Sequence, residues 1–328
     1  MTTFQYESAL AGAIGGLIRQ KQAMGYRYEG ESRMLYRFDQ FVLSQGVEET
    51  QLDKLLVDTW NQRLTHEAHA TWCGRRTVVR QLALYMTEMG MKAYVTPKAT
   101  VSKGPRYVPH IYSDAELVAF FRQVDACRYC AEIPYRHWSL PVLFRLLYGT
   151  GLRLSEALHL QLADVDDQSG VLTIRDGKFH KDRLIPVAES LRQRLTTYRQ
   201  QVHQFSSNDT IFFLGAPRRP LTGGNVYKNF RRFLWRAGIS HGGWSKGPRV
   251  HDFRHTYSVH CLRRWVREGR DLTAALPLLR TYLGHHSFQD TSHYLRLTAD
   301  LYPDIVLRME EAVGHVLPDA GGDLVETN

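Results

Sequence analysis

A basic stretch that contains several prolines divides the chain in two and sets the first limit on its fold. Residues 93–112, AYVTPKATVSKGPRYVPHIY, hold three prolines, two lysines and one arginine, and no acidic residue. Proline removes a backbone N–H donor and disfavours helical conformation in the residue before it, so we expect no continuous helix here. The stretch is predicted to be an extended linker with one domain on each side.

The composition provides material for two hydrophobic cores. The 328 residues are 43% hydrophobic and 23% charged, as in ordinary globular proteins. The net charge is +9 at pH 7. A basic excess of this size fits a polyanionic partner, most often nucleic acid, and a basic enzyme without such a partner is the competing interpretation.

Residues 1–92 are predicted to form a helical domain. Apolar residues recur at helical spacing in four segments that could enclose a small core, residues 4–24, 29–44, 52–64 and 71–89. The last of these segments and the linker carry basic side chains that we predict to contact a DNA backbone: Arg75, Arg76, Arg80, Lys98, Lys103 and Arg106. A solvated polar face and a plain interdomain linker are the alternatives.

Residues 113–317 are predicted to form a second domain, mainly helical with a small β-sheet. Ser113 and Glu116 have the spacing of a capping box, which starts a helix. Two β-prone runs, 171–174 and 183–187, flank a polar turn, and Pro186 places the second run at a sheet edge. The further predicted helices cover residues 134–147, 152–160, 189–202, 225–237 and 302–316. The helix over 225–237 presents a basic face for DNA, with Lys228, Arg231 and Arg232, and residues 318–328 form a polar tail.

Cysteine usage and hydropathy predict a cytoplasmic protein without a membrane partner. Cys127 and Cys130 form a single CxxC pair, which is half of a zinc site, so two thiols in a reducing compartment are the favoured interpretation. The apolar run over residues 9–18 is too short and too rich in small residues to span a bilayer.

Residues 249–297 contain side chains that suit the transfer of a phosphodiester. His251 and Arg254 lie three residues apart on one helix face, His285 follows a Leu-Gly turn, and Tyr294 comes nine residues later. A guanidinium donates two parallel hydrogen bonds to a phosphate and stays charged. Arg254 and Arg153, from two different elements, are therefore predicted to clamp one phosphate.

Tyr294 is the candidate nucleophile of this set. A phenol has a pKa near 10 and needs a basic neighbour or a positive field, which His285 or His251 would supply. The leaving sugar oxygen needs a proton. Lys178, at the tip of the predicted hairpin, is the candidate acid, and Lys181 is the alternative.

Several of these residues also have less specific interpretations. His251 and His255 have the HxxxH spacing of a zinc protease helix, but the glutamate that such a helix uses as a base is absent, and Arg254 would repel a cation. Tyr294 is one of 17 tyrosines and, taken alone, fits a packed core position. His286 and His293 are expected at the surface or behind the site.

The order of these motifs resembles the tyrosine recombinase (phage integrase) family. The resemblance rests on Gly151-Leu-Arg153-Leu-Ser-Glu156, Gly177-Lys178, His251-Asp-Phe-Arg254-His255, Leu283-Gly-His285 and Tyr294. It covers residues 113–317. The first domain is similar to the family's helical core-binding domain in size, charge and position alone.

The resemblance implies a C-shaped clamp of the two domains around duplex DNA and a reaction without ATP, metal or other cofactor. Tyr294 would attack the scissile phosphate and form a 3′-phosphotyrosyl link, which a 5′-hydroxyl of a partner strand would then attack. The hairpin sequence GKFHK lacks the second glycine that the family often has, which leaves Lys178 and Lys181 both open. The implied catalytic set is Arg153, Lys178, His251, Arg254, His285 and Tyr294, with a supporting role for Glu156.

The resemblance also implies partners and a biological role. The partners are a double-stranded recombination site and further copies of the chain, a tetramer in the synapse, joined in some systems by a paralogous recombinase or accessory factors. We expect integration, excision or transposition of a mobile element, with chromosome-dimer resolution or inversion as alternatives. A type IB topoisomerase and a DNA-binding protein that has lost activity are further alternatives.

Overall fold

The chain divides into two compact units, residues 1–106 and 107–328. The computed structural model describes residues 4–97, 107–175, 182–242 and 247–285, and the single residues Thr291, Tyr294, Leu295, Leu297 and Thr298. None of the helices in these ranges has the length and apolar character needed to cross a membrane.

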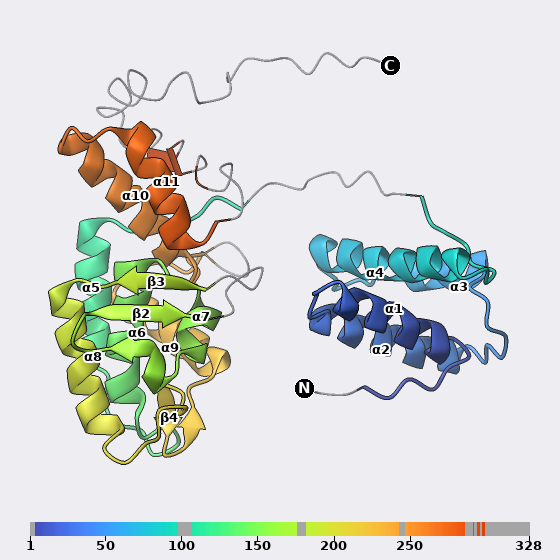
Figure 1. Cartoon of the computed structure of the whole chain (residues 1–328), viewed down its shortest axis with the longest axis horizontal. Helices are drawn as coiled ribbons and strands as arrows, with labels where there is room; N and C mark the ends of the chain where they lie inside the picture. The colour runs from blue at the N-terminus through green and yellow to red at the C-terminus, as the bar shows by residue number, and fades with distance from the viewer. Residues whose placement is uncertain are drawn as a thin grey trace. The chain divides into compact units, whose positions relative to one another are not determined.

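The first unit is a small helical domain, as predicted (Figure 1). Its helices are α1 (Ala11–Ala23), α2 (Glu29–Ser44), α3 (Lys54–Asn61) and α4 (His69–Glu88). Helix α4 is at the centre, because the other three all pack against it. Buried apolar side chains, among them Leu35, Phe38 and Leu82, form the core.

Helix α1 begins at Ala11, so the prediction of a helix from Phe4 is wrong for residues 4–10. The buried carboxylate of Asp39 on α2 accepts hydrogen bonds from the backbone N–H groups of Glu7 (3.0 Å) and Ser8 (3.1 Å) and from the Ser8 hydroxyl (2.6 Å). Donors that bond a distant side chain are withdrawn from a helical turn, which explains the late start.

Arg75 on α4 is buried in the core of this unit and does not lie on the exposed basic face from which we predicted it to contact DNA. The residue is 4% exposed. Its Nε and Nη2 atoms lie 3.0 and 2.8 Å from the two carboxylate oxygens of Glu67, and its guanidinium lies over the ring of Trp60, 4.8 Å from the centroid. Arg75 therefore fixes the segment that precedes α4.

The second unit begins at Tyr107, earlier than the predicted boundary at residue 113. The Tyr107 hydroxyl donates to Oδ2 of Asp252 (2.6 Å). The buried ring of Tyr112 stacks on Phe253, with 5.0 Å between centroids. Residues 107–112 thus pack on a helix of this unit and do not behave as linker.

The buried helix α6 (Arg136–Thr150) is at the centre of the second unit. It packs against four other helices, α5 (Asp114–Asp125), α7 (Leu154–His159), α8 (Glu189–Val202) and α10 (Asp252–Arg267). The other helices named within the described ranges are α9 (Gly223–Arg236), α11 (Leu272–Leu283) and the 3-10 turn η1 (Leu162–Asp164), whereas the predicted helix over 302–316 lies outside the described residues. The predicted capping box of Ser113 and Glu116 is present at the start of α5.

A small antiparallel sheet covers part of this helical core. Its strands are β1 (Val165–Asp166), β2 (Val171–Ile174) and β3 (Arg183–Pro186), in that spatial order. Strand β3 is at the edge, as Pro186 predicts. The turn that carries Lys178 and Lys181 lies outside the described residues. A second hairpin, β4 (Leu214–Ala216) with β5 (Arg219–Pro220), was not predicted.

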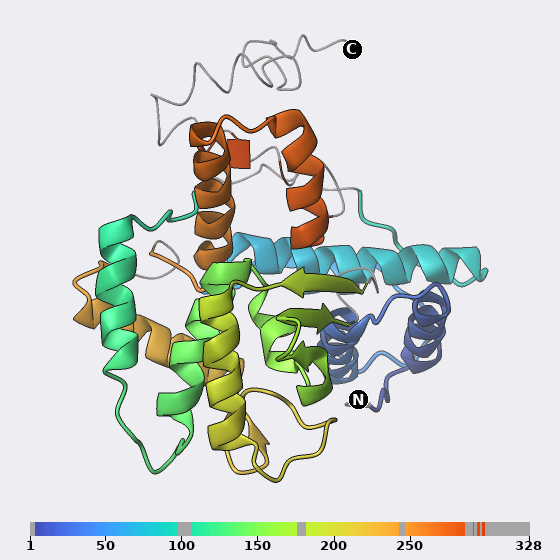
Figure 2. The same cartoon turned by 60° about the vertical axis from the view of Figure 1, so that its left-hand side comes forward.

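Helices α10 and α11 lie side by side at one end of the second unit, and α11 contacts β3 (Figures 1 and 2). Helix α7 follows directly after α6 and packs against it. The ends of α6, α10 and α11 are therefore available to form one site.

The buried pair of Arg75 and Glu67 makes a prediction about stability. Arg75→Met should lower the free energy of unfolding by about 3–5 kcal/mol, because it leaves the Glu67 carboxylate buried without its partner. Adding Glu67→Leu should recover most of this loss. Urea unfolding of the full chain measures both effects. The control is Arg33→Met on the exposed side of α2, and equal stability of wild type and Arg75→Met would contradict the pair's role.

Candidate active site

Five predicted catalytic residues come from the ends of neighbouring elements in the second unit. Arg153 is the residue before α7, His251 the residue before α10, and Arg254 lies in the first turn of α10. His285 follows the end of α11, and Tyr294 lies beyond it. The contacts below join all five, whereas Lys178 lies outside the described residues.

Arg254 is buried and held by two backbone carbonyls. It is 2% exposed. Its Nη1 donates to the Gly151 carbonyl (2.8 Å) and its Nη2 to the Leu283 carbonyl (2.7 Å). Burial, together with the charge of Arg153, lowers the pKa of Arg254 to about 10. The guanidinium is thus still charged at neutral pH and has one fixed orientation.

Gly151 makes possible the close approach of the end of α6 to Arg254 and to the end of α11. It ends α6 in the left-handed conformation, with φ of 63°. A Cβ atom at this position would lie 2.8 Å from Tyr257 and 2.9 Å from Leu283 side-chain atoms. Glycine is therefore required both by the backbone and by the packing around it.

Glu156 joins Arg153 to a residue that the sequence analysis missed, Arg183. Oε1 of Glu156 accepts from Arg153 Nη1 (2.8 Å) and Arg183 Nη1 (3.1 Å). Oε2 accepts from the Arg153 backbone N–H (2.9 Å) and Arg183 Nη2 (2.8 Å). Burial alone would raise the pKa of Glu156, but hydrogen bonds and charge from Arg183, with Arg153, hold it at about 2.

Three successive carbonyls at the end of α11 each accept from a different arginine. Arg183 Nε donates to the Tyr282 carbonyl (3.0 Å), Arg254 Nη2 to Leu283 (2.7 Å), and Arg153 Nη2 to Gly284 (3.4 Å). We call residues 282–284 with these arginines the arginine-capped end of α11. Carbonyls in the last turn of a helix lack helical partners and carry partial negative charge, so cations stabilise them.

His251 is held as a neutral imidazole. Partial desolvation, followed by the charges of Arg254 and Arg153, lowers the pKa of His251 to about 4, although more than a third of the residue is exposed to solvent. Its ring meets that of His255 edge-on, with 5.0 Å between centroids. A neutral histidine at pH 7 can accept a proton, which a protonated one cannot.

Tyr294 lies against His285 and close to Arg254. It is 3% exposed, and its ring stacks on that of His285 with centroids 5.8 Å apart and 19° between planes. His285 in turn has Nδ1 2.9 Å from the Thr291 hydroxyl. Burial raises the pKa of Tyr294, and the charge of Arg254 and hydrogen bonds to Ser258 and Arg254 offset part of that rise. The phenol is therefore protonated in the free chain.

The predicted DNA-contacting residues differ in their surroundings. Lys228, Arg231 and Arg232 are exposed on α9. Arg76 and Arg80 on α4 are half-buried: the Arg76 guanidinium lies over the Trp72 ring at 4.6 Å, and Arg80 Nε donates to the Thr96 carbonyl (2.9 Å). The linker residues Lys98, Lys103 and Arg106 lie outside the described residues.

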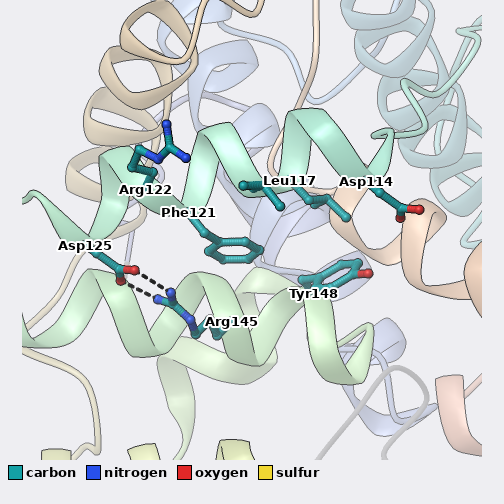
Figure 3. A pocket seen from close by; sticks show the side chains of 8 residues that line it. Asp114, Leu117, Phe121, Arg122, Asp125, Arg145 and Tyr148 are labelled. Atoms are coloured by element: carbon teal, nitrogen blue, oxygen red, sulfur yellow. Dashed lines mark hydrogen bonds and ion pairs between the residues drawn. The ribbon is translucent and has the colours of Figure 1, made fainter.

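Neither a metal cluster nor the groove of the second unit offers an alternative site within the described residues. Within the described ranges no group of three or more His, Cys, Asp or Glu side chains could hold a metal ion. A groove of about 570 Å³ lies between α5 and α6, where Phe121 and the ion pair of Arg145 with Asp125 (2.7 Å) line it (Figure 3). None of the candidate catalytic residues lines this groove.

Comparisons with known proteins agree with this geometry. Residues 121–300, which include the arginine-capped end of α11, match the model of the phage integrase family. The integrase/recombinase y4rB of Sinorhizobium fredii is 30% identical over 305 residues, 91% of this chain and 96% of that protein. The tyrosine recombinase XerA of Pyrococcus furiosus is 32% identical over 174 residues, 52% of this chain and 55% of that protein. The Tn1549 transposon integrase, solved with a circular intermediate DNA, has a TM-score of 0.60 at 16% identity over 86% of this chain and 94% of that chain.

The lowered pKa of His251 predicts how stability depends on pH. A histidine in the unfolded chain has a pKa of about 6.5, above the folded value of about 4. Between these values the unfolded state binds more protons, so stability should fall as pH drops from about 6.5 toward 4, by an amount that solvent screening of this exposed residue reduces. His251→Asn should make this fall smaller, as measured by urea unfolding at several pH values. His66→Asn in the first unit is the control, and the same pH dependence in His251→Asn and wild type would contradict the prediction.

Proposed function

Because the chain belongs to the phage integrase family, whose tyrosine recombinases cut and rejoin DNA, we propose that Tyr294 is its nucleophile and that Arg153 and Arg254 hold the scissile phosphate. The observation that carries this proposal is the contact of Tyr294 with His285 and with the charge of Arg254. A guanidinium has five N–H donors, so the two carbonyl bonds of Arg254 leave donors for the phenol and for a phosphate.

The arginines act on the charge of the phosphate. Negative charge on the non-bridging oxygens shifts as the phosphorus is attacked, and donors aimed at them in advance stabilise the transition state. The arginine-capped end of α11 provides such donors, because backbone carbonyls and Glu156 already fix the orientation of Arg153 and Arg254.

The first chemical step exchanges one phosphate ester for another. The Tyr294 oxygen forms a bond to phosphorus, and the bond from phosphorus to the 5′ oxygen breaks. The phenol proton passes to a neutral histidine, His285 or His251, and the leaving 5′ oxygen takes a proton from Lys178 or, as the alternative, Lys181. The product is a 3′-phosphotyrosyl link and a free 5′-hydroxyl.

The second step reverses the first with a new strand. A 5′-hydroxyl from a partner strand attacks the link and releases the Tyr294 oxygen, which regains its proton. The phosphotyrosyl ester conserves the energy of the broken bond, so the reaction needs neither ATP nor a metal ion.

We infer a role in integration, excision or transposition of a mobile element. A relative that matches 91% of this chain is an integrase/recombinase, and a transposon integrase shares the fold. Resolution of chromosome dimers or inversion is the alternative within the family, and the partial match to the tyrosine recombinase XerA does not distinguish between these roles. A type IB topoisomerase would use the same chemistry without pairing two sites.

The proposed partners are a duplex recombination site and further copies of the chain. The helical first unit and the exposed basic face of α9 would hold the duplex, so the chain would work in the cytoplasm, where its DNA lies. Four copies would form the synapse, in which residues 301–328 would join neighbouring copies and accessory factors would take part. The mass of the complex on paired sites tests the stoichiometry, and a complex of one copy per duplex would contradict it.

Tyr294→Phe should abolish covalent attachment to DNA while leaving binding intact, because it removes the attacking oxygen and keeps the ring. The chain is incubated with DNA from the flanks of its own gene that carries a nick to trap the intermediate. The adduct is then denatured and sequenced. A wild-type adduct at one site that is absent in the variant is expected. Adducts at many sites would favour the topoisomerase alternative, and an adduct in the variant would exclude Tyr294 as nucleophile.

Removing one basic charge from α9 should weaken the binding of DNA, and the loss should fall on the part of the affinity that depends on salt concentration. Each of Lys228→Gln, Arg231→Gln and Arg232→Gln should reduce the slope of log affinity against log salt by roughly 1, if each side chain contacts one phosphate. Fluorescence anisotropy at several salt concentrations measures the slope. Arg194→Gln, at an exposed position of α8, removes one charge elsewhere and should leave the slope unchanged.

A further inference from the structure

Arg183 is a buried arginine next to the proposed catalytic residues that no step of the proposed reaction uses. It opens strand β3, and its side chain is 10% exposed. All the hydrogen bonds described for it run to two elements of the site, Glu156 on α7 and the Tyr282 carbonyl at the end of α11.

Arg183 and Arg153 both donate hydrogen bonds to the Glu156 carboxylate. Each oxygen of Glu156 accepts one bond from Arg183 and one from Arg153. The paired, planar geometry of Arg183 fixes the plane of the carboxylate, and that plane fixes where the Arg153 guanidinium lies. Without Arg183, a 7% exposed carboxylate would have Arg153 as its counter-charge and would draw it away from a phosphate.

Arg183 also holds the residues directly before His285. Its Nε bonds the Tyr282 carbonyl, and its guanidinium packs so closely on Gly284 that a Cβ there would lie 3.2 Å from Cζ of Arg183. Strand β3 is thereby joined to the end of α11 and, through Glu156, to Arg153.

We propose that Arg183 is a positioning residue for strand cleavage, which acts by keeping Arg153 directed at the scissile phosphate. This inference rests on the proposed function, because it assumes that Arg153 contacts the phosphate. It assigns a role in the reaction to a residue that need not touch DNA.

The test compares Arg183→Gln and Arg183→Lys with wild type in single-turnover formation of the covalent adduct. Arg183→Gln should slow cleavage roughly tenfold to a hundredfold, since small displacements of a catalytic group cost rates of this order. Arg183→Lys should recover little of the loss, because an ammonium keeps the charge but lacks the planar fork. DNA affinity should change by less than about twofold, because the described hydrogen bonds of Arg183 run to Glu156 and the Tyr282 carbonyl and the proposal assigns it no phosphate contact.

A second substrate separates positioning from general damage to the fold. A methylphosphonate at the scissile position replaces one charged non-bridging oxygen with a methyl group, so less charge needs an arginine. On this substrate the ratio of the wild-type cleavage rate to the Arg183→Gln rate should be at least about fivefold smaller than on the phosphate substrate. The same ratio for Arg153→Ala should also become smaller, because both residues act on phosphate charge. A variant that is merely misfolded would lose the same factor on both substrates.

Matched controls complete the experiment. Arg145→Gln breaks a bidentate pair of the same kind, with Asp125 in the groove of Figure 3, and should leave cleavage unchanged. All rates are measured below the unfolding temperature of each variant. Normal cleavage by Arg183→Gln, or equal losses on both substrates, would overturn the proposal. Absence of any wild-type adduct would instead reject the proposed function itself.

Discussion

The carbonyl groups at the end of α11 are the acceptors on which the whole site depends. Arg153, Arg183 and Arg254 carry like charges. Burial first, and then the charges of Arg153 and Arg183, lower the pKa of Arg254, and Glu156 alone does not balance three charges. The last carbonyls of a helix lack internal partners and lie at its negative end, so they stabilise cations without adding a titratable group. The chain can therefore hold three arginines together before any phosphate arrives.

Sequence periodicity predicted most of the helices because their apolar faces repeat every three to four residues. Residues 29–44 and 189–202 were predicted with the observed bounds. The start of α1 was not, because a buried carboxylate on another helix, Asp39, takes up the backbone donors of Glu7 and Ser8. The hairpin of β4 and β5 was missed because its strands of three and two residues are too short to show alternation.

Residues of the candidate site could be predicted from the sequence where a residue type at a given spacing suits one chemical task. They could not be predicted where a tertiary contact decides the role of the residue. Arg153, His251, Arg254, His285 and Tyr294 come from neighbouring ends of elements in the second unit, and their catalytic roles stay predictions. Arg75 and Arg183 show the limit. Sequence could not tell that one arginine is paired with Glu67 in the core and the other with Glu156 beside the site. The glutamates were visible, but their partners lie eight and twenty-seven positions away.

Gly151 helps to identify relatives of this protein that have kept its fold but lost its activity. Its left-handed backbone and the crowding by Tyr257 and Leu283 are demands of folding, independent of any reaction. A descendant that had lost catalysis would still need glycine there as long as it kept this fold, whereas the hydroxyl of Tyr294 is held in the free chain by its hydrogen bonds to Ser258 and Arg254 and not by a demand of the backbone. The glycine that begins the Gly-Leu-Arg motif therefore indicates that a relative has kept the fold. A phenylalanine in place of the tyrosine would indicate that the relative is a pseudoenzyme.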